Sequence, residues 1–176
     1  PIAMSVPDGN GDVAFQFDQS TSAVAKTWIM AAAEKGEEIP LGWAIDSDGE
    51  PTTNAKKALD GAIAPFGGYK GFGIGLMVET FTALMSGAAL STEASRFVGP
   101  DGGYPNVGQS FIAMDPKAFV SSPDYATQTG KLCQNITNQD GARLPGSRSL
   151  NTRITSKSNG ILIDTVLFKK VQRLTN

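Results

Sequence analysis

Apolar and polar positions alternate in two places near the start of the chain. The first run covers residues 2–6 and the second covers residues 13–17, and the segment DGNGD between them is rich in turn-forming residues. Alternation with a period of two residues is typical of a half-buried strand, and an Asp/Asn/Gly turn between two such runs is typical of a hairpin. The pattern therefore predicts a β-hairpin. The same alternation over residues 107–115 predicts another strand, which ends before Pro116.

Helical patterns follow the hairpin. Residues 20–36 are expected to form a helix that begins at a hydroxyl-bearing residue and ends at Gly36. The N-cap candidates are Ser20, Thr21 and Ser22, and the residues expected on one buried face are Val24, Trp28 and Ile29. Further helices are predicted over residues 55–59 and 122–139, a turn over residues 143–149, and a short strand followed by a final helix within residues 159–176.

A longer apolar run lies between residues 72 and 90. Its apolar side chains recur at i, i+4, i+7, i+8 and i+11, which is helical periodicity; they belong to Met77, Phe81, Leu84, Met85 and Ala88. The run is nearly long enough to span a membrane. Glu79, however, would then lie near the bilayer centre, at a cost of roughly 2.5 kcal/mol or more. We therefore expect a buried helix of a soluble protein and no membrane partner.

Strands and helices alternate irregularly along the 176 residues, and this order favours a mixed α/β or α+β fold. The hydrophobic content of 40% and the charged content of 18% are those of an ordinary globular protein. The net charge is -2 and the basic residues are scattered, so nothing indicates a nucleic-acid partner. The single cysteine, Cys133, excludes an internal disulfide bond and favours a reducing, cytoplasmic setting.

The chain contains no histidine. Proton chemistry by this chain alone would therefore depend on Asp, Glu, Lys or Tyr side chains. The acidic turn DGNGD lacks the glycine and the glutamate that a calcium-binding loop needs at later positions, and no metal site is expected. The first residue is Pro1, within what reads as the middle of a strand, so we expect the chain to be a piece of something longer or a processed product.

The segment GGYKGFGIG, residues 67–75, is unusually rich in glycine and contains a single charge, that of Lys70. It matches neither the spacing of the Rossmann fingerprint nor that of the phosphate-binding loop. Glycines before a helix let a ligand approach the backbone, and the free N–H groups at the helix start favour an anion. The same glycines would also let the helix pack closely on a neighbour. From the residues alone, both interpretations stay open.

Two further segments have a functional and a structural interpretation. In FDQSTS, residues 17–22, the acidic Asp18 and the hydroxyl groups that follow it could bind ribose or phosphate oxygens, although helix capping explains the hydroxyl groups equally simply. In LPGSRS, residues 144–149, the turn is flanked by Arg143 and Arg148. This pair could hold a phosphate or could belong to a solvated loop.

Taken together, these stretches resemble the malate/L-lactate/ureidoglycolate-type NAD(P)H-dependent dehydrogenases. This family is not built on the Rossmann fold and includes sulfolactate dehydrogenases, 2,3-diketogulonate reductases and piperideine-2-carboxylate reductases. The resemblance is carried by NGDVAFQFDQSTSAVAKTWIMAAAEKGEEIPLGWAIDSDGEPTT, PFGGYKGFGIGLMVETFTALMSGA, PNVGQSFIAMDPKAF and RLPGSR, which cover most of the chain in the family's order.

The resemblance implies a mostly antiparallel mixed sheet flanked by helices, an NAD or NADP cofactor, and a homodimer. It divides the chain into a cofactor-binding domain, residues 1–120, and a C-terminal helical segment, residues 121–176, that would pack with an N-terminal part. It also implies three groups of cofactor-binding residues: Asp18, Gln19, Ser20, Thr21 and Ser22; Tyr69 and Lys70; and Gly146, Ser147 and Arg148.

The same resemblance places the family's catalytic histidine, and a serine and an arginine that help to bind the substrate carboxylate, in an N-terminal portion outside this chain. Relatives often carry histidine where this chain has Tyr69 and Gln109. The implied function is a dehydrogenase that transfers a hydride between a nicotinamide and C2 of a small 2-hydroxy or 2-oxo acid. The missing half could be supplied as another chain. The alternative hypothesis is a non-catalytic binding or structural domain of the same fold.

Overall fold

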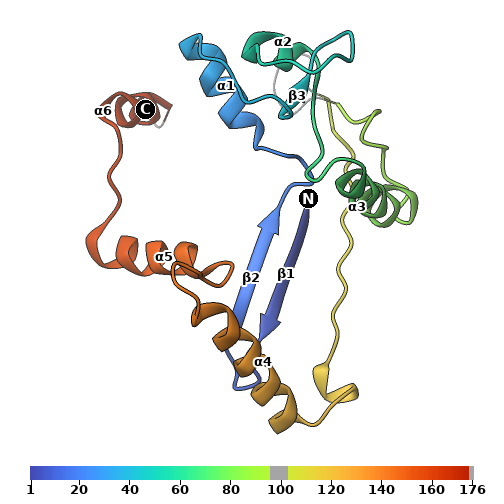
Figure 1. The fold of residues 1–176 in the computed structure, drawn as a ribbon. Helices are drawn as coiled ribbons and strands as arrows, with labels where there is room; N and C mark the ends of the chain where they lie inside the picture. Colours follow the sequence, from blue (N-terminus) through green and yellow to red (C-terminus); the bar gives the residue numbers. More distant parts are fainter. Residues whose placement is uncertain (96–102, 175–176) are drawn as a thin grey trace. The chain divides into compact units, whose positions relative to one another are not determined.

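The computed structural model describes residues 1–95 and 103–174, and within them helices alternate with short strands (Figure 1). The elements, in chain order, are β1 (Ile2–Pro7), β2 (Val13–Gln19), α1 (Lys26–Lys35), β3 (Ala44–Ile45), α2 (Ala55–Asp60), β4 (Ala62–Ile63), α3 (Tyr69–Glu79), η1 (Thr80–Leu84), η2 (Pro116–Ala118), α4 (Ser122–Thr137), α5 (Ser147–Asn159) and α6 (Thr165–Leu174). The mixed class expected from the sequence is confirmed. In the part of the chain described, the strands form two separate pairs, β1–β2 and β3–β4, rather than one sheet.

The chain divides into two compact units. Unit 1 comprises Pro1–Ala3 and Asp18–Asp115, and unit 2 comprises Met4–Phe17 and Pro116–Asn176. The division expected from the resemblance, at residue 120, concerns the roles of the segments in the whole protein and stays a prediction.

Unit 1 has a small apolar core between α1 and α2. Its buried residues are Ile29, Ile39, Ala44, Ala55 and Ala58. Ile29 is fully buried, whereas its neighbour Trp28 is 65% exposed. The expectation that Trp28 lies on the buried face is therefore wrong. Successive helical residues point about 100° apart, so the turn that directs Ile29 at α2 directs Trp28 outward.

Helix α1 begins later than the sequence predicts. Its N-cap is Ala25, and no side chain in the described chain caps it. The hydroxyl groups of residues 20–22 therefore do not cap α1, and that expectation is wrong, because the backbone of residues 21–23 is paired with residues 64–66 instead. The predicted stop is confirmed: Gly36 adopts φ 70°, and its N–H donates to the last turn of the helix.

The short helix predicted near residue 55 is present as α2. The Asn54 side chain caps it by accepting from the N–H groups of Lys56 and Lys57. The strands on either side of α2, in which Ala44 pairs with Ile63 and Ile45 with Ala62, were not predicted from the sequence. Strands of two residues are too short to show a periodic pattern.

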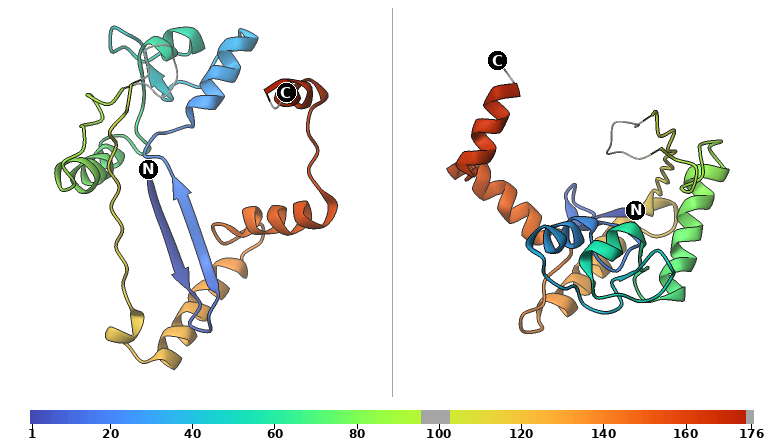
Figure 2. Two further views of the ribbon diagram at one scale, coloured as in Figure 1. Left: turned by 180° about the vertical axis from the view of Figure 1, so that it is seen from behind. Right: turned by 90° about the horizontal axis from the view of Figure 1, so that it is seen from above.

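The glycine-rich segment opens helix α3, which continues directly into the π-helix η1 (Figure 2). The apolar face expected to be buried is largely exposed in this chain: Met85, for example, is 69% exposed. Along the segments described, no helix is long and apolar enough to cross a membrane.

Residues 107–115 do not form the predicted strand, and two of them, Gly108 and Ser110, lie against the π-helix η1. The N–H of Met85 donates to the carbonyl of Thr80, in the i to i+5 register. The Ser110 hydroxyl donates to the carbonyl of Phe81 at 2.7 Å. A Cβ on Gly108 would overlap the carbonyl oxygen of Thr82. The segment is thus held against a helix end rather than a strand, and the strand prediction is wrong.

Unit 2 contains most of the predicted hairpin, whose strands run antiparallel in Figure 1. The Asp8 carboxylate accepts from the N–H groups of Asn10 and Asp12 and closes the turn, and the Asn10 N–H lowers the pKa of Asp8. Gly9 lies against Ala126 of α4, where a Cβ would come within 2.7 Å of the Ala126 Cβ. The hairpin and α4 confirm the sequence predictions for these segments.

The C-terminal helices differ in part from the predictions. Helix α5 was not predicted, because nearly all of its side chains are polar and its two apolar residues, Leu150 and Ile154, are too few to show an apolar stripe. No strand forms at residues 161–163, which are extended and unpaired within the described chain. The final helix is confirmed as α6, where the Asp164 carboxylate caps the start by accepting from Val166 and Leu167. Residues 96–102 of the loop before the predicted strand, and residues 175–176, lie outside the described part.

The glycines of α3 give a matched pair for a stability test. A Cβ on Gly71 would overlap the carbonyl oxygen of Phe66, whereas a Cβ on Gly73 would meet nothing within 4 Å. We expect Gly71→Ala to lower the free energy of unfolding by about 1–3 kcal/mol through overpacking, and Gly73→Ala to raise it by about 0.5–1 kcal/mol through helix propensity. Denaturant unfolding measures both. Equal effects would contradict the close approach at Gly71.

The hydrogen bonds of Glu79 predict that the stability of the fold depends on pH. The Ser91 hydroxyl, and then the Ser91 N–H at 2.6 Å, donate to its carboxylate and lower the pKa of Glu79. A lowered folded-state pKa stabilises the fold above the ordinary Glu pKa, and the stabilisation is lost as pH falls through the lowered value. We expect Glu79→Gln to reduce the loss of thermal stability between neutral pH and acid. Glu34→Gln, on α1, controls for the removal of one carboxylate; identical pH profiles for both variants would contradict the role of Ser91.

Candidate functional site

The loop that follows β2 is fastened to the segment that precedes the glycine-rich helix. The N–H of Phe66 donates to the carbonyl of Thr21 at 3.0 Å, and the N–H of Ala23 donates to the carbonyl of Ala64 at 2.7 Å. Ser22 also forms an antiparallel bridge with Pro65. Two segments more than 40 residues apart in sequence are thereby brought side by side in unit 1.

The side chains of this loop form a short hydroxyl network. The hydroxyl groups of Ser20 and Ser22 lie 2.7 Å apart, and the Ser22 hydroxyl donates to the carbonyl of Val24 at 2.9 Å. Ser22 is half-buried, whereas Asp18, Gln19 and Ser20 are exposed at the end of β2. The loop therefore offers a carboxyl, an amide and a hydroxyl group at its surface.

Helix α3 begins three residues after Phe66. Its N-cap is Gly68, with φ 63° and ψ -130°, a conformation that a residue with a Cβ rarely adopts. No side chain in the described ranges caps the helix, so the N–H groups of its first turn remain available to a ligand or to water. Tyr69 and Lys70 are exposed at this start, Tyr69 by 81%.

The structure confirms the close-packing interpretation of this stretch at Gly71, which is buried against Phe66. Gly73 has no such neighbour. Gly75 faces the Thr21 hydroxyl at ordinary contact distance, 3.8 Å from an added Cβ. Close packing and an accessible helix start therefore coexist, because the glycines that pack and the residues that remain exposed occupy different positions.

The donor set in unit 1 suits part of a dinucleotide. Free helix N–H groups and an ammonium group favour an anion such as a phosphate, while a carboxyl group and a hydroxyl group suit the hydroxyls of a ribose. The Thr21–Phe66 hydrogen bond brings the two kinds of group together. Because both kinds of group lie in unit 1, the residues present are chemically compatible with part of such a cofactor.

A second group lies in unit 2, at the start of α5. The N-cap is Gly146, with φ 86°, and an added Cβ there would lie 2.7 Å from the carbonyl oxygen of Gln16. The Gln16 N–H donates to the carbonyl of Pro145 at 3.3 Å, and the Ser147 hydroxyl donates to that of Leu144 at 2.8 Å. Glycine is required here because the turn is pressed against β2.

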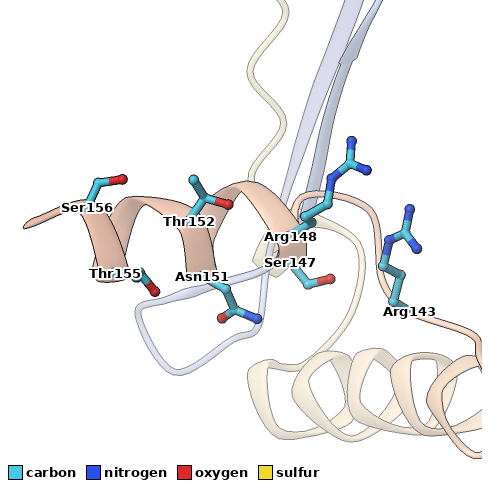
Figure 3. Close-up of a pocket in the computed structure, with 7 residues that line it drawn as sticks. All are labelled: Arg143, Ser147, Arg148, Asn151, Thr152, Thr155 and Ser156. Carbon is cyan, nitrogen blue, oxygen red and sulfur yellow. The ribbon is translucent and has the colours of Figure 1, made fainter. Parts of the chain in front are cut away.

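A cavity of about 520 Å³ opens beside this turn. Figure 3 shows the side chains of Arg143 and Arg148 extending to the same side of the turn. The polar side chains of α5 lie farther along the helix. The lining residues are Arg143, Ser147, Arg148, Asn151, Thr152, Thr155 and Ser156. Two guanidinium groups with no acidic residue among the lining favour an anionic ligand.

The arginines and Ser147 of this lining were predicted from the sequence, whereas the rest of the lining was not. The missed residues are Asn151, Thr152, Thr155 and Ser156. Their spacing of i, i+1, i+4 and i+5 would place them along one side of a helix, and this signal was available once a helix, rather than a turn, was assumed there.

The candidate residues therefore form two groups, one in each unit. Within the residues that the structure covers, no cluster of three or more His, Cys, Asp or Glu side chains could hold a metal ion.

Comparison with known proteins decides the family. The profile of the family described as malate/L-lactate dehydrogenase matches residues 1–172. The chain belongs to this family. The resemblance inferred from the sequence is thereby confirmed.

Curated relatives of this family member include reductases and dehydrogenases. The chain is 40% identical to Delta(1)-pyrroline-2-carboxylate reductase 1 of Burkholderia ambifaria over 176 residues, which cover 99% of the chain and 51% of the relative. It is 40% identical to (2R)-3-sulfolactate dehydrogenase (NADP(+)) of Chromohalobacter salexigens over 148 residues, 84% of the chain and 44% of the relative. The chain thus spans about half the length of the curated relatives it matches.

Solved structures agree in fold. The delta1-piperideine-2-carboxylate reductase from Pseudomonas syringae matches with a TM-score of 0.86 and 32% identity, over 98% of the chain and 52% of that protein. The sulfolactate dehydrogenase from Methanocaldococcus jannaschii matches with a TM-score of 0.81 and 32% identity, over 97% of the chain and 50% of that protein.

The lining of the cavity beside α5 predicts that Arg148 contributes to the binding of anions. Arg148 lines it and Arg153, on the same helix, does not. We expect Arg148→Ala to weaken the binding of inorganic pyrophosphate at low ionic strength by about 1.5–3 kcal/mol, the range for a hydrogen bond to a charged group, and Arg153→Ala to have a much smaller effect. Isothermal titration calorimetry measures both. Equal losses of affinity in the two variants would mean that the effect comes from the net charge of the protein rather than from a contact with Arg148.

Proposed function

We propose that this chain is the cofactor-binding part of an NAD(P)-dependent oxidoreductase. The whole protein would transfer a hydride between the nicotinamide and C2 of a small 2-hydroxy, 2-oxo or 2-imino acid. The observation that carries the proposal is the exposed, uncapped start of α3 with Lys70, fastened beside the hydroxyl-bearing loop by the hydrogen bond between Phe66 and Thr21. Family membership and the names of the relatives support the same reaction class.

In this proposal each group of residues has a distinct role. The first-turn N–H groups of α3 and the Lys70 ammonium bind a cofactor phosphate, with Tyr69 beside them. The loop residues bind ribose or amide groups; they are Asp18, Gln19, Ser20, Thr21 and Ser22. Gly146, Ser147 and Arg148 form a further set of cofactor contacts at the start of α5, where Gly146 admits a close backbone approach and Arg148 supplies charge.

The bound nicotinamide supplies or accepts the hydride, and the protein contributes orientation and electrostatics. A proton must move with the hydride at the substrate oxygen or nitrogen. Because the chain contains no histidine, we place the acid/base group, together with the substrate carboxylate contacts, in protein outside these 176 residues. That part could be a separate chain.

The remaining expectations belong to the same proposal. Residues 1–120 act as the cofactor-binding domain, and residues 121–176 pack with the rest of the protein, where the two strand pairs join a larger antiparallel sheet. Exposed apolar side chains on α3 and α6, such as Leu76 and Leu174, support such burial. We further propose a homodimer and a cytoplasmic location, and leave the cofactor as NAD or NADP. One relative is named for NADP(+).

A thermal-shift and titration experiment tests the proposal. NADH or NADPH should raise the unfolding temperature of the full-length protein that contains this chain, because a ligand that binds only the folded state stabilises it. Lys70→Ala should weaken cofactor binding by about 1.5–3 kcal/mol, as the loss of a charge-assisted hydrogen bond. Lys56→Ala, an exposed lysine of α2, should leave the dissociation constant unchanged.

The alternative, a non-catalytic binding or structural domain of the same fold, predicts a different outcome. The absence of histidine is the observation in its favour. Cofactor binding without turnover of any 2-oxo acid would support this alternative. No binding of either cofactor would refute the oxidoreductase assignment.

A further inference from the structure

The hydroxyl network in the loop after β2 has a direction. The Ser22 hydroxyl donates to the carbonyl of Val24, and a carbonyl oxygen can only accept. A serine hydroxyl carries a single hydrogen, so Ser22 has none left for Ser20. The hydrogen between the two hydroxyl oxygens, 2.7 Å apart, must therefore come from Ser20.

The surrounding backbone holds this direction in place. Residues on both sides of Ser22 are fastened by hydrogen bonds to the neighbouring segment, Thr21 through Phe66 and Ala23 through Ala64. Reversal of the network would take the Ser22 hydrogen away from the Val24 carbonyl. That hydrogen bond would be lost, and nothing else in the network would replace it.

The exposed Ser20 hydroxyl is consequently left with lone pairs only. It can accept a hydrogen bond from a ligand but cannot donate one without breaking the network. A phosphate oxygen, which itself only accepts, would meet lone pairs at this point. A ribose hydroxyl or a carboxamide N–H, which donates, would be matched. Asp18, two residues earlier and also exposed, is acidic and disfavours an anion as well.

We infer that Ser20 is a specificity-determining residue that accepts a hydrogen bond from a neutral donor of the bound dinucleotide, a ribose hydroxyl or the nicotinamide carboxamide. Ser22 is a positioning residue that fixes the polarity of Ser20. The inference rests on the proposed cofactor binding and deepens it, because it separates the loop after β2, which selects neutral donors, from the start of α3, which selects the anion.

Titration of the full-length protein with NADH tests the inference through four variants. Ser20→Ala should raise the dissociation constant about 2- to 12-fold, since one neutral hydrogen bond contributes about 0.5–1.5 kcal/mol. Ser22→Ala should produce a smaller increase, and Ser22→Thr, which keeps the hydroxyl, should restore the original value. Ser47→Ala, an exposed serine of another turn in unit 1, is the control and should have no effect.

Two further ligands identify the group that Ser20 contacts. Inorganic pyrophosphate should bind Ser20→Ala as well as the unsubstituted protein, whereas an equal loss for pyrophosphate and NADH would mean that Ser20 contacts phosphate and would overturn the inference. ADP-ribose lacks the carboxamide. A Ser20→Ala effect that persists with ADP-ribose assigns a ribose hydroxyl, and one that disappears assigns the carboxamide; both support the acceptor role.

The remaining outcomes separate the inference from the proposed function. If NADH binds and Ser20→Ala leaves its dissociation constant unchanged, the inference alone fails. If neither NADH nor NADPH binds the unsubstituted protein, the proposed function fails and the inference with it. Because Ser20 is exposed, its truncation should leave the unfolding temperature without ligand unchanged, which confirms that the variant is folded.

Discussion

The pairing of residues 21–23 with residues 64–66 is the interaction on which the candidate site of unit 1 depends. Two backbone hydrogen bonds, Phe66 to Thr21 and Ala23 to Ala64, fasten the end of β2 to the approach to α3. Without them the loop hydroxyls and the glycine-rich helix start would belong to separate surfaces. The pairing also explains why these hydroxyls do not cap α1: the backbone around them is hydrogen-bonded to residues 64–66, and the helix begins only after Ala25.

Glycine at position 71 is the steric counterpart of this pairing. The carbonyl oxygen of Phe66 occupies the space that a side chain at position 71 would need. Helix α3 can therefore start immediately beside the paired segment while its outward residues stay accessible. The Rossmann fold positions its glycine-rich turn and helix start by a parallel strand, whereas the glycine-rich turn of this chain is positioned by pairing with a distant loop.

The chain buries a small apolar core and leaves many large apolar side chains exposed in the part that the structure describes. One apolar cluster in unit 1 is formed around Ile29, while large apolar residues on α3, on α6 and along residues 107–120 are exposed. Exposed apolar patches of more than a few hundred Å² are typical of interaction surfaces. That is consistent with a chain that spans about half the length of its relatives.

Local patterns predicted the hairpin, α2, α4, α6 and the end of α1 at Gly36, because alternation, capping residues and a C-terminal glycine act within a few residues. They also singled out Lys70 and Arg148 as charges beside glycine turns. They failed for Trp28, for residues 107–115 and for α5, where the outcome depends on which neighbour is present. Only the tertiary structure decided that the loop after β2 pairs with residues 64–66. This pairing holds the loop in which the Ser20 hydroxyl donates its hydrogen to Ser22. Such pairing joins residues too far apart in the chain for any local pattern to record.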